Sequence, residues 1–172
     1  MTQGLDELVA VLHKGKRIGV PRKQSIGMVV LTAHVLLFNP KGEILLTQRS
    51  TISLYGKWDV GITETLRSYE TFMSAAKRGL NEELQMDYRN MPFLAKQSEQ
   101  LFKDGLFKRQ VFTYSGTYAG EIKPNQTEVM AFEWVCPTEA VWQIQSNARP
   151  FRDLSAKIGL RYLQMLQHQR MG

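Results

Sequence analysis

The chain has 172 residues, 43% of them hydrophobic and 22% charged, which is typical of one globular domain with a buried core. There are 22 lysine and arginine residues against 16 aspartate and glutamate residues, so the net charge of +6 favours anionic partners such as phosphorylated metabolites. The single cysteine, Cys136, excludes an internal disulfide and a thiolate metal cluster. The longest apolar run, residues 28–38, is too short for a membrane-spanning helix, and no targeting segment is recognisable, so we expect a cytoplasmic protein without membrane contact.

The first part of the sequence predicts strands. Residues 7–21 contain two short apolar segments around a glycine turn, which indicates a hairpin within an N-terminal extension of residues 1–26. Residues 28–38 carry apolar or β-branched side chains at nearly every position, the pattern of a strand buried on both faces. A turn at "NPKGE" follows, and residues 44–50 return as the partner strand.

Helical periodicity becomes strong between residues 69 and 86, where apolar side chains recur at steps of three and four residues. Three strand-like segments follow, with a hairpin turn at Asp104-Gly105. Pro137 is typical of a first helical turn, and residues 150–172 predict a C-terminal helix. This order predicts the α/β class, with a mixed sheet packed between helices in a single domain of residues 1–172.

The central helix carries the residues with chemical interest. Gly79, Glu82 and Glu83 lie on one of its faces, because residues three and four apart are neighbours. Carboxylates at all three positions would converge on a hard cation such as Mg²⁺ or Mn²⁺, but only two are present. Glu70, eight residues before Arg78, can fold back onto the guanidinium and fix the loop that precedes the helix. From these residues alone, the helix is either a metal site that lacks one carboxylate or the solvated face of an amphipathic helix.

Residues 58–86, "WDVGITETLRSYETFMSAAKRGLNEELQM", resemble a Nudix box, whose pattern is G-x5-E-x7-R-E-U-x-E-E-x-G-U with U an aliphatic residue. The retained positions are Glu70, Arg78, Leu80, Glu82, Glu83 and Met86. The departures are Glu64 at the opening glycine, Gly79 at the first glutamate of the R-E-U triplet and Gln85 at the late glycine. The box is therefore degenerate, and Gly79 stands where the family has a principal metal ligand.

Segments outside the box extend the resemblance. "AHVLLFNPKGEILLTQRS", "GKWDV" and "EVMAFEWVCPTEA" are similar, in this order and spacing, to Nudix proteins related to isopentenyl-diphosphate isomerase. The resemblance implies the Nudix α/β/α sandwich with a mixed sheet. It does not imply isomerase activity, because that enzyme's catalytic cysteine falls just after the second core strand, where this chain has none; Cys136 comes much later.

For intact family members, the resemblance implies hydrolysis of a diphosphate linked to another moiety, with the help of Mg²⁺ or Mn²⁺. Carried over by position, Glu82 and Glu83 become metal ligands and catalytic residues, with Glu83 the more important. Glu70 and Arg78 become the structural pair of the box. The additional candidate metal ligands are Glu64 and Glu128.

Two functions stay open on this basis. One is a Nudix-type diphosphate hydrolase whose activity is weak or altered because Gly79 replaces a glutamate. The other is a catalytically inactive module that binds a nucleotide, another phosphorylated metabolite or a protein partner. Arg22, Arg49 and Arg109 are the candidate contacts for a phosphorylated small molecule. The basic residues are scattered and not interleaved with aromatic ones, so nucleic acid is not an expected partner, whereas a homodimer is consistent with the family.

Overall fold

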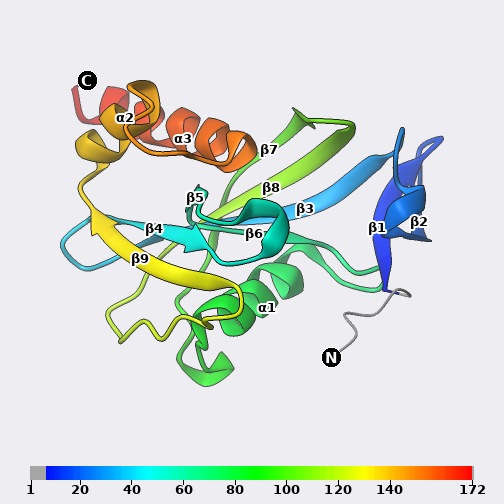
Figure 1. Ribbon diagram of the computed structural model, residues 1–172, viewed down its shortest axis with the longest axis horizontal. Helices are drawn as coiled ribbons and strands as arrows, with labels where there is room; N and C mark the ends of the chain where they lie inside the picture. The colour runs from blue at the N-terminus through cyan, green and yellow to red at the C-terminus, as the bar shows by residue number, and fades with distance from the viewer. Residues whose placement is uncertain (1–6, 172) are drawn as a thin grey trace.

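The computed structural model describes residues 7–171, so the first residues of the expected N-terminal extension lie outside the described part of the chain. A nine-stranded mixed sheet forms the centre, with α1 on one face and α2 and α3 on the other (Figure 1). The strands are β1 (Leu8–His13), β2 (Lys16–Pro21), β3 (Val29–Phe38), β4 (Ile44–Arg49), β5 (Trp58–Val60), β6 (Ile62–Thr65), β7 (Ala95–Asp104), β8 (Phe107–Thr117) and β9 (Val129–Val135). The helices are α1 (Phe72–Leu84), α2 (Pro137–Gln145) and α3 (Asp153–Met171), with short 3-10 turns at Arg22–Gln24, Ile52–Leu54 and Tyr88–Asn90. The predicted α/β class is confirmed, and no helix within residues 7–171 is long and apolar enough to cross a membrane.

The strand β3 organises the sheet. One of its edges pairs in parallel with β8 along its whole length. Its other edge is shared by three strands in succession, β1 at Val29 and Val30, β6 from Thr32 to Val35, and β4 at Phe38 alone. Because β3 and β4 pair at only one position and then diverge, the sheet divides into two arms, one with β3, β8 and β7 and the other with β4, β5 and β9.

Successive side chains of β3 point to opposite faces of the sheet, so the strand contributes to a core on each face. This confirms the prediction of a strand buried on both faces. Leu31, Ala33, Val35 and Leu37 pack in the core beneath α1. Leu36 packs in the core beneath α2 and α3. Eight of the ten residues of β3 are therefore buried, with a core on each face of the strand.

The segment from β5 to β6 crosses from one arm to the other, which the sequence did not reveal as strand. β5 pairs with β4, and β6 pairs with β3. Gly61 between them has φ of 80°, and a Cβ there would collide with the carbonyl group of Val35. Only glycine allows this close crossing, and it places β6 directly beside α1.

The helix α1 is shorter than the predicted 69–86, and its ends have local causes. The Thr71 hydroxyl accepts a hydrogen bond from the Ser74 amide at 3.0 Å, and the Ser74 hydroxyl accepts one from the Thr71 amide at 2.9 Å, so both form a capping box. At the other end, Gln85 adopts a left-handed conformation with φ of 53°. The helix therefore begins just after Glu70, which stays in the preceding loop.

His34 is a fully buried histidine on the α3 face of β3. Its Nδ1 lies 2.8 Å from the Thr63 hydroxyl. Burial and, to a smaller extent, the positive charge of Arg152 lower the pKa of His34 from 6.5 to about 3. The neutral ring is therefore part of the native packing.

We expect His34 to make folding stability depend on pH. Because its pKa is lower in the folded chain, the unfolded chain binds the proton first, so the contribution is complete above pH 6.5 and is lost as the pH falls toward 3. The slope in this window is about 1.4 kcal/mol of unfolding free energy per pH unit. Chemical denaturation between pH 4 and 7 measures it. His34→Asn removes this component, whereas His13→Asn, at an exposed position, retains it; equal slopes in both variants would contradict the assignment.

Candidate functional site

Arg78 on α1 is the centre of the charged region beside the helix. Its Nε and Nη2 donate to the two carboxylate oxygens of Glu70 at 2.7 and 2.9 Å. Its Nη2 also donates to the Thr65 carbonyl oxygen at 3.0 Å, which fixes the end of β6 to the helix. Burial alone lowers the pKa of Arg78, but the hydrogen bonds to Glu70 and the nearby carboxylates outweigh it and raise the pKa. The pair therefore joins the loop, the helix and β6.

Two further carboxylates share the same guanidinium. Arg78 Nη1 lies 2.8 Å from Glu64 Oε2 and 3.1 Å from Glu82 Oε2. Glu82 is also 3.4 Å from Arg67 Nη2, and its side chain is 37% exposed. Glu64 and Glu82 are candidate metal ligands by the family resemblance. In the structure, both carboxylates are instead paired with Arg78.

Gly79 provides the space that Glu64 occupies. A Cβ built on Gly79 would collide with Cγ of Glu64 and lie 3.0 Å from Cγ2 of Ile62. The Glu64 side chain, which comes from β6, thus crosses the helix surface where a side chain at position 79 would begin. Burial raises the pKa of Glu64, the charge of Arg78 opposes this, and the charge of Glu82 adds to it. Glycine and glutamate at these two positions therefore form one packing unit.

Glu83 lies on the other side of the box and is 1% exposed. Arg49 Nη1, at the end of β4, is 2.9 Å from Glu83 Oε2, and Arg49 Nε is 3.7 Å from Asp59 Oδ2 on β5. Burial raises the pKa of Glu83, and the charges of Glu64 and Asp59 raise it further against the opposing charge of Arg49. Glu128 contributes a negative charge near Arg49, and its carbonyl oxygen accepts from the Ser50 amide at 3.0 Å.

The positions of these carboxylates do not fit the metal site that the resemblance implies. Within residues 7–171, no three acidic, histidine or cysteine side chains are arranged to hold a metal ion. Arg78 holds Glu64 and Glu82, and Arg49 keeps its positive charge beside Glu83. A divalent cation would have to displace both guanidinium groups or tolerate their repulsion at short range.

A second group of charged residues continues from Asp59 on the α3 side. Arg152 Nη1 lies 4.0 Å from Asp59 Oδ1, and Arg152 Nη2 lies 3.8 Å from Asp104 Oδ2. Arg109 Nε on β8 donates to the same Asp104 oxygen at 2.6 Å, and its Nη1 is 3.3 Å from the hydroxyl groups of Thr32 and Thr65. We call Arg49, Arg109 and Arg152, with Asp59 and Asp104, the arginine cluster.

The three arginines of the arginine cluster contact two aspartates within it, and a third carboxylate, Glu83, lies against Arg49. The side chains of Arg49, Arg109 and Arg152 are only 12%, 11% and 15% exposed. Burial lowers the pKa of Arg109, and the positive charges of Arg152 and Arg22 lower it further despite Asp104. Arg22 and Arg109 also border a cavity of about 70 Å³. Positive charge therefore exceeds negative charge at the end of the cluster where Arg22, Arg109 and Arg152 lie near Asp104, and an anion would be stabilised there.

The structure thus brings together Arg49 and Arg109, which the sequence singled out, and places Arg22 near Arg109. It adds Asp59, Asp104 and Arg152, which the sequence analysis missed. Asp59 lies in the segment "GKWDV" that carried the family resemblance, so a signal existed there. Asp104 was assigned only to a turn, and Arg152 has no local pattern.

Comparisons with known proteins agree with this fold. The sequence profile described as the NUDIX domain matches residues 28–155. The chain is similar to the crystal structure of a Deinococcus radiodurans protein, with TM-score 0.72, 18% identity, and 91% of this chain and 98% of that chain covered. It is also similar to dihydroneopterin triphosphate pyrophosphohydrolase of E. coli, with TM-score 0.60, 16% identity and coverage of 77% and 92%. The NUDIX domain of Shewanella oneidensis NrtR, complexed with ADP ribose, gives TM-score 0.61, 15% identity and coverage of 82% and 88%. No curated protein matches the sequence.

Proposed function

Because this chain belongs to the Nudix family, we propose that it binds a phosphorylated small molecule through a diphosphate group at the arginine cluster and hydrolyses it slowly or not at all. The observation that carries this proposal is the excess of positive charge at one end of the cluster, where Arg109 and Arg152 share Asp104 and the charge of Arg22 acts on Arg109. A similar NUDIX domain binds ADP ribose, which supports a ligand of this kind.

The long ion pairs of Arg152 suggest how a diphosphate would bind. Its contacts with Asp59 and Asp104, at 4.0 and 3.8 Å, are too long for good hydrogen bonds, so little is lost when the guanidinium turns to a phosphate. Arg109 is fixed by Asp104 and can offer its remaining donors without moving. Arginine suits phosphate because its planar donors can bind two oxygens at once.

Slow or absent hydrolysis follows from the arginine partners of the box carboxylates. Family members typically use a divalent metal, and Mg²⁺ or Mn²⁺ bound by Glu82 and Glu83 remains a prediction for this chain. In the arrangement described above, those carboxylates neutralise Arg78 and Arg49 instead. The water-activating step of the family is therefore expected to be impaired.

A second candidate function, a hydrolase with an altered site, is favoured by the position of Glu64. Its side chain crosses Gly79, so the box region still has three carboxylates, Glu64, Glu82 and Glu83. A rearrangement of Arg78 and Arg49 on ligand binding would be needed before these carboxylates became free. The two candidates differ in one measurable property, the rate of product release.

The experiment combines calorimetric binding and product analysis, with ADP and ADP-ribose as probes. We expect binding in the presence of EDTA, because the arginine cluster needs no metal to attract an anion. Arg109→Gln should weaken binding at least tenfold, since it removes charge-assisted hydrogen bonds. The matched control is Arg161→Gln, an exposed arginine on α3 that donates to Gln100 and should leave binding unchanged.

Chromatography after addition of Mg²⁺ or Mn²⁺ decides between the two candidates. Rapid metal-dependent product release that disappears in Glu83→Gln would establish the hydrolase. Binding without turnover would establish the inactive module. Failure of both probes to bind would contradict a diphosphate ligand at the arginine cluster.

A further inference from the structure

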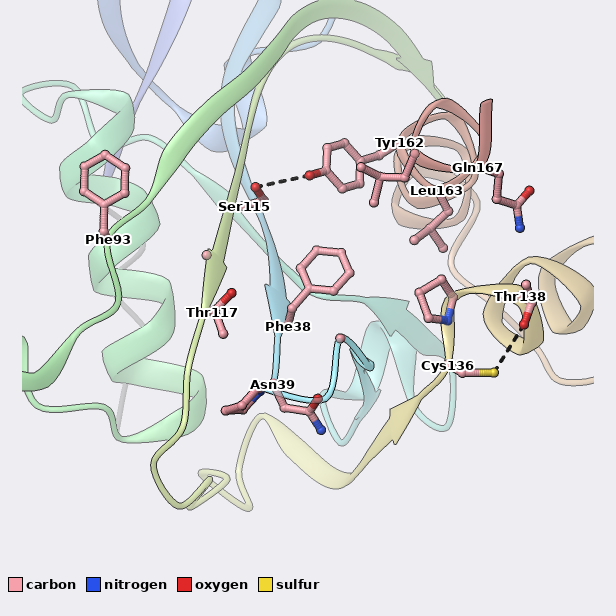
Figure 2. Close-up of a pocket in the computed structure, with 15 residues that line it drawn as sticks. Phe38, Asn39, Phe93, Ser115, Thr117, Cys136, Thr138, Tyr162, Leu163 and Gln167 are labelled. Carbon is pink, nitrogen blue, oxygen red and sulfur yellow. Dashed lines mark hydrogen bonds between the residues drawn. The ribbon is translucent and has the colours of Figure 1, made fainter. Parts of the chain in front are cut away.

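A cavity of about 680 Å³ lies between the sheet and the helices α2 and α3 (Figure 2). It is far from the arginine cluster, because it borders the opposite end of β3, where Phe38 pairs with Thr117. Arg109 and Thr117 are eight residues apart on β8 (117 − 109), about 26 Å at 3.3 Å per residue. The volume is within the range of about 300–1,000 Å³ that small-molecule sites occupy.

Aromatic rings form much of the wall. Figure 2 shows the rings of Phe38 and Tyr162 directed into the space between β8 and α3. Their centroids are 6.1 Å apart and their planes are inclined by 47°, so each ring leaves part of its face uncovered by the other. Pro137 and Leu163 add apolar surface. A flat ring would gain contact area and aromatic interactions here.

Hydrogen-bonding groups accompany the rings. The Ser115 hydroxyl oxygen accepts from Tyr162 at 3.3 Å, and it also accepts from the Gln97 amide nitrogen at 2.9 Å. Its own hydrogen is therefore left to donate to a bound molecule. The side chains of Thr117 on β8 and Gln167 on α3 also line the cavity and supply further donors and acceptors.

Charge distinguishes this cavity from the rest of the molecule. None of the fifteen described residues that line it is charged, although the whole chain has a net charge of +6. An ionic group would lose hydration in the cavity without gaining a counter-ion. An uncharged ligand with polar edges would keep its hydrogen bonds and bury its ring faces.

We propose that this cavity is a second binding site, for an uncharged ring compound with hydrogen-bonding groups, the chemical class that nucleosides represent. The rings of Phe38 and Tyr162 contact the faces of the ligand, and Ser115 and Tyr162 bind its polar edge. The site is independent of the diphosphate site proposed above, because no residue of the arginine cluster takes part.

The test uses adenosine, guanosine, cytidine and uridine as probes in equilibrium dialysis with the full chain. We expect at least one of them to bind saturably, and Ser115→Val to weaken its binding about fivefold, the effect of one lost neutral hydrogen bond. Tyr162→Phe should have a similar effect, whereas Tyr118→Phe, outside the cavity, should have none. Carboxamidomethylation of Cys136 at the rim should block binding, with Cys136→Ser as the unblocked control.

Three results would overturn the proposal. One is the absence of binding of all four nucleosides at millimolar concentration. Another is binding that neither the cavity substitutions nor the modification of Cys136 weakens. The third is loss of nucleoside binding in Arg109→Gln, which would locate the nucleoside at the arginine cluster. Sedimentation of the natural chain and of the cavity variants is measured in parallel, so that a change in oligomeric state is not taken for a change in nucleoside binding.

Discussion

Gly79→Ala is expected to destabilise the natural chain, yet to be neutral or stabilising in a chain that already carries Glu64→Ala. In the natural chain the new Cβ collides with Cγ of Glu64, whose carboxylate Arg78 holds in place, so the side chain cannot swing away freely. Overpacking of this kind costs about 1–3 kcal/mol, while alanine improves helix propensity by about 1 kcal/mol over glycine. The net loss should be up to about 2 kcal/mol.

Removing the colliding atom reverses the balance. Glu64→Ala retains Cβ but deletes Cγ, so only the 3.0 Å contact with Ile62 remains to oppose the helix-propensity gain. The coupling free energy between positions 64 and 79 should be about 2 kcal/mol, within the range for residues in contact. Chemical denaturation of the four chains measures it. If the two substitutions were additive, Glu64 would not be the reason for glycine on this helix.

The contact between positions 64 and 79 also determines which substitutions can restore the missing glutamate of the Nudix box. Gly79→Glu alone would force two glutamate side chains into one space. Glu64→Gly with Gly79→Glu exchanges them and restores the family residues at both positions. Product release from ADP-ribose is therefore a fair test of the missing carboxylate only in the double variant.

Arg78→Met should cause the largest loss of stability in the region, about 3–5 kcal/mol, the range for breaking a buried ion pair by removing one partner. Methionine approximates the length of the side chain but leaves Glu64 and Glu70, both largely buried, without their shared guanidinium. The matched control is Arg67→Met, because Arg67 is 30% exposed and contacts Glu82 at 3.4 Å. Such a pair is worth at most about 1 kcal/mol.

The pH dependence separates an electrostatic loss from a packing loss in Arg78→Met. Burial raises the pKa of Glu70, but its hydrogen bonds with Arg78 and with the Arg67 amide outweigh burial and lower it. A lowered carboxyl pKa stabilises the fold above the unfolded-state value and loses this effect as the pH falls. The difference between natural chain and variant should therefore shrink in acid. Because the pKa of Glu70 is lowered from 4.5, this decrease falls below pH 4.5. A difference that stayed constant from pH 6 to pH 3 would assign the loss to packing.

The features that could be predicted best from the sequence are those that depend on residues close together in the chain. The alternation and apolar run of residues 28–38 and the periodicity of the central helix reflect local burial, and the structure has β3 and α1 there. β5 and β6, with three and four residues, are too short for a pattern to be visible. The arginine cluster could not be predicted, because Arg49 and Arg109 lie on distant strands and Arg152 reaches their aspartates only through the contact of the loop before α3 with β5.

The contact between Glu64 and Gly79 is visible in the sequence only when the two departures from the family pattern are considered together. Relative to the family pattern, one position has gained a glutamate side chain and the other has lost one, fifteen residues later in sequence (79 − 64). An exchange of volume between two positions suggests spatial contact. Only the crossing segment, which places β6 beside α1, explains why these two positions touch.

The strands on the two edges of β3 also bear on the order in which the molecule folds. Every β3–β8 pair joins residues 79 positions apart (108 − 29), so this parallel pairing closes a long loop and is slow to form. Arg109 reaches Thr32 and Thr65 only after β8 has joined β3 and β6 has docked on the other edge. We therefore expect the proposed anion site to be completed only when the sheet has closed, and a molecule bound there would hold the completed sheet together against partial unfolding.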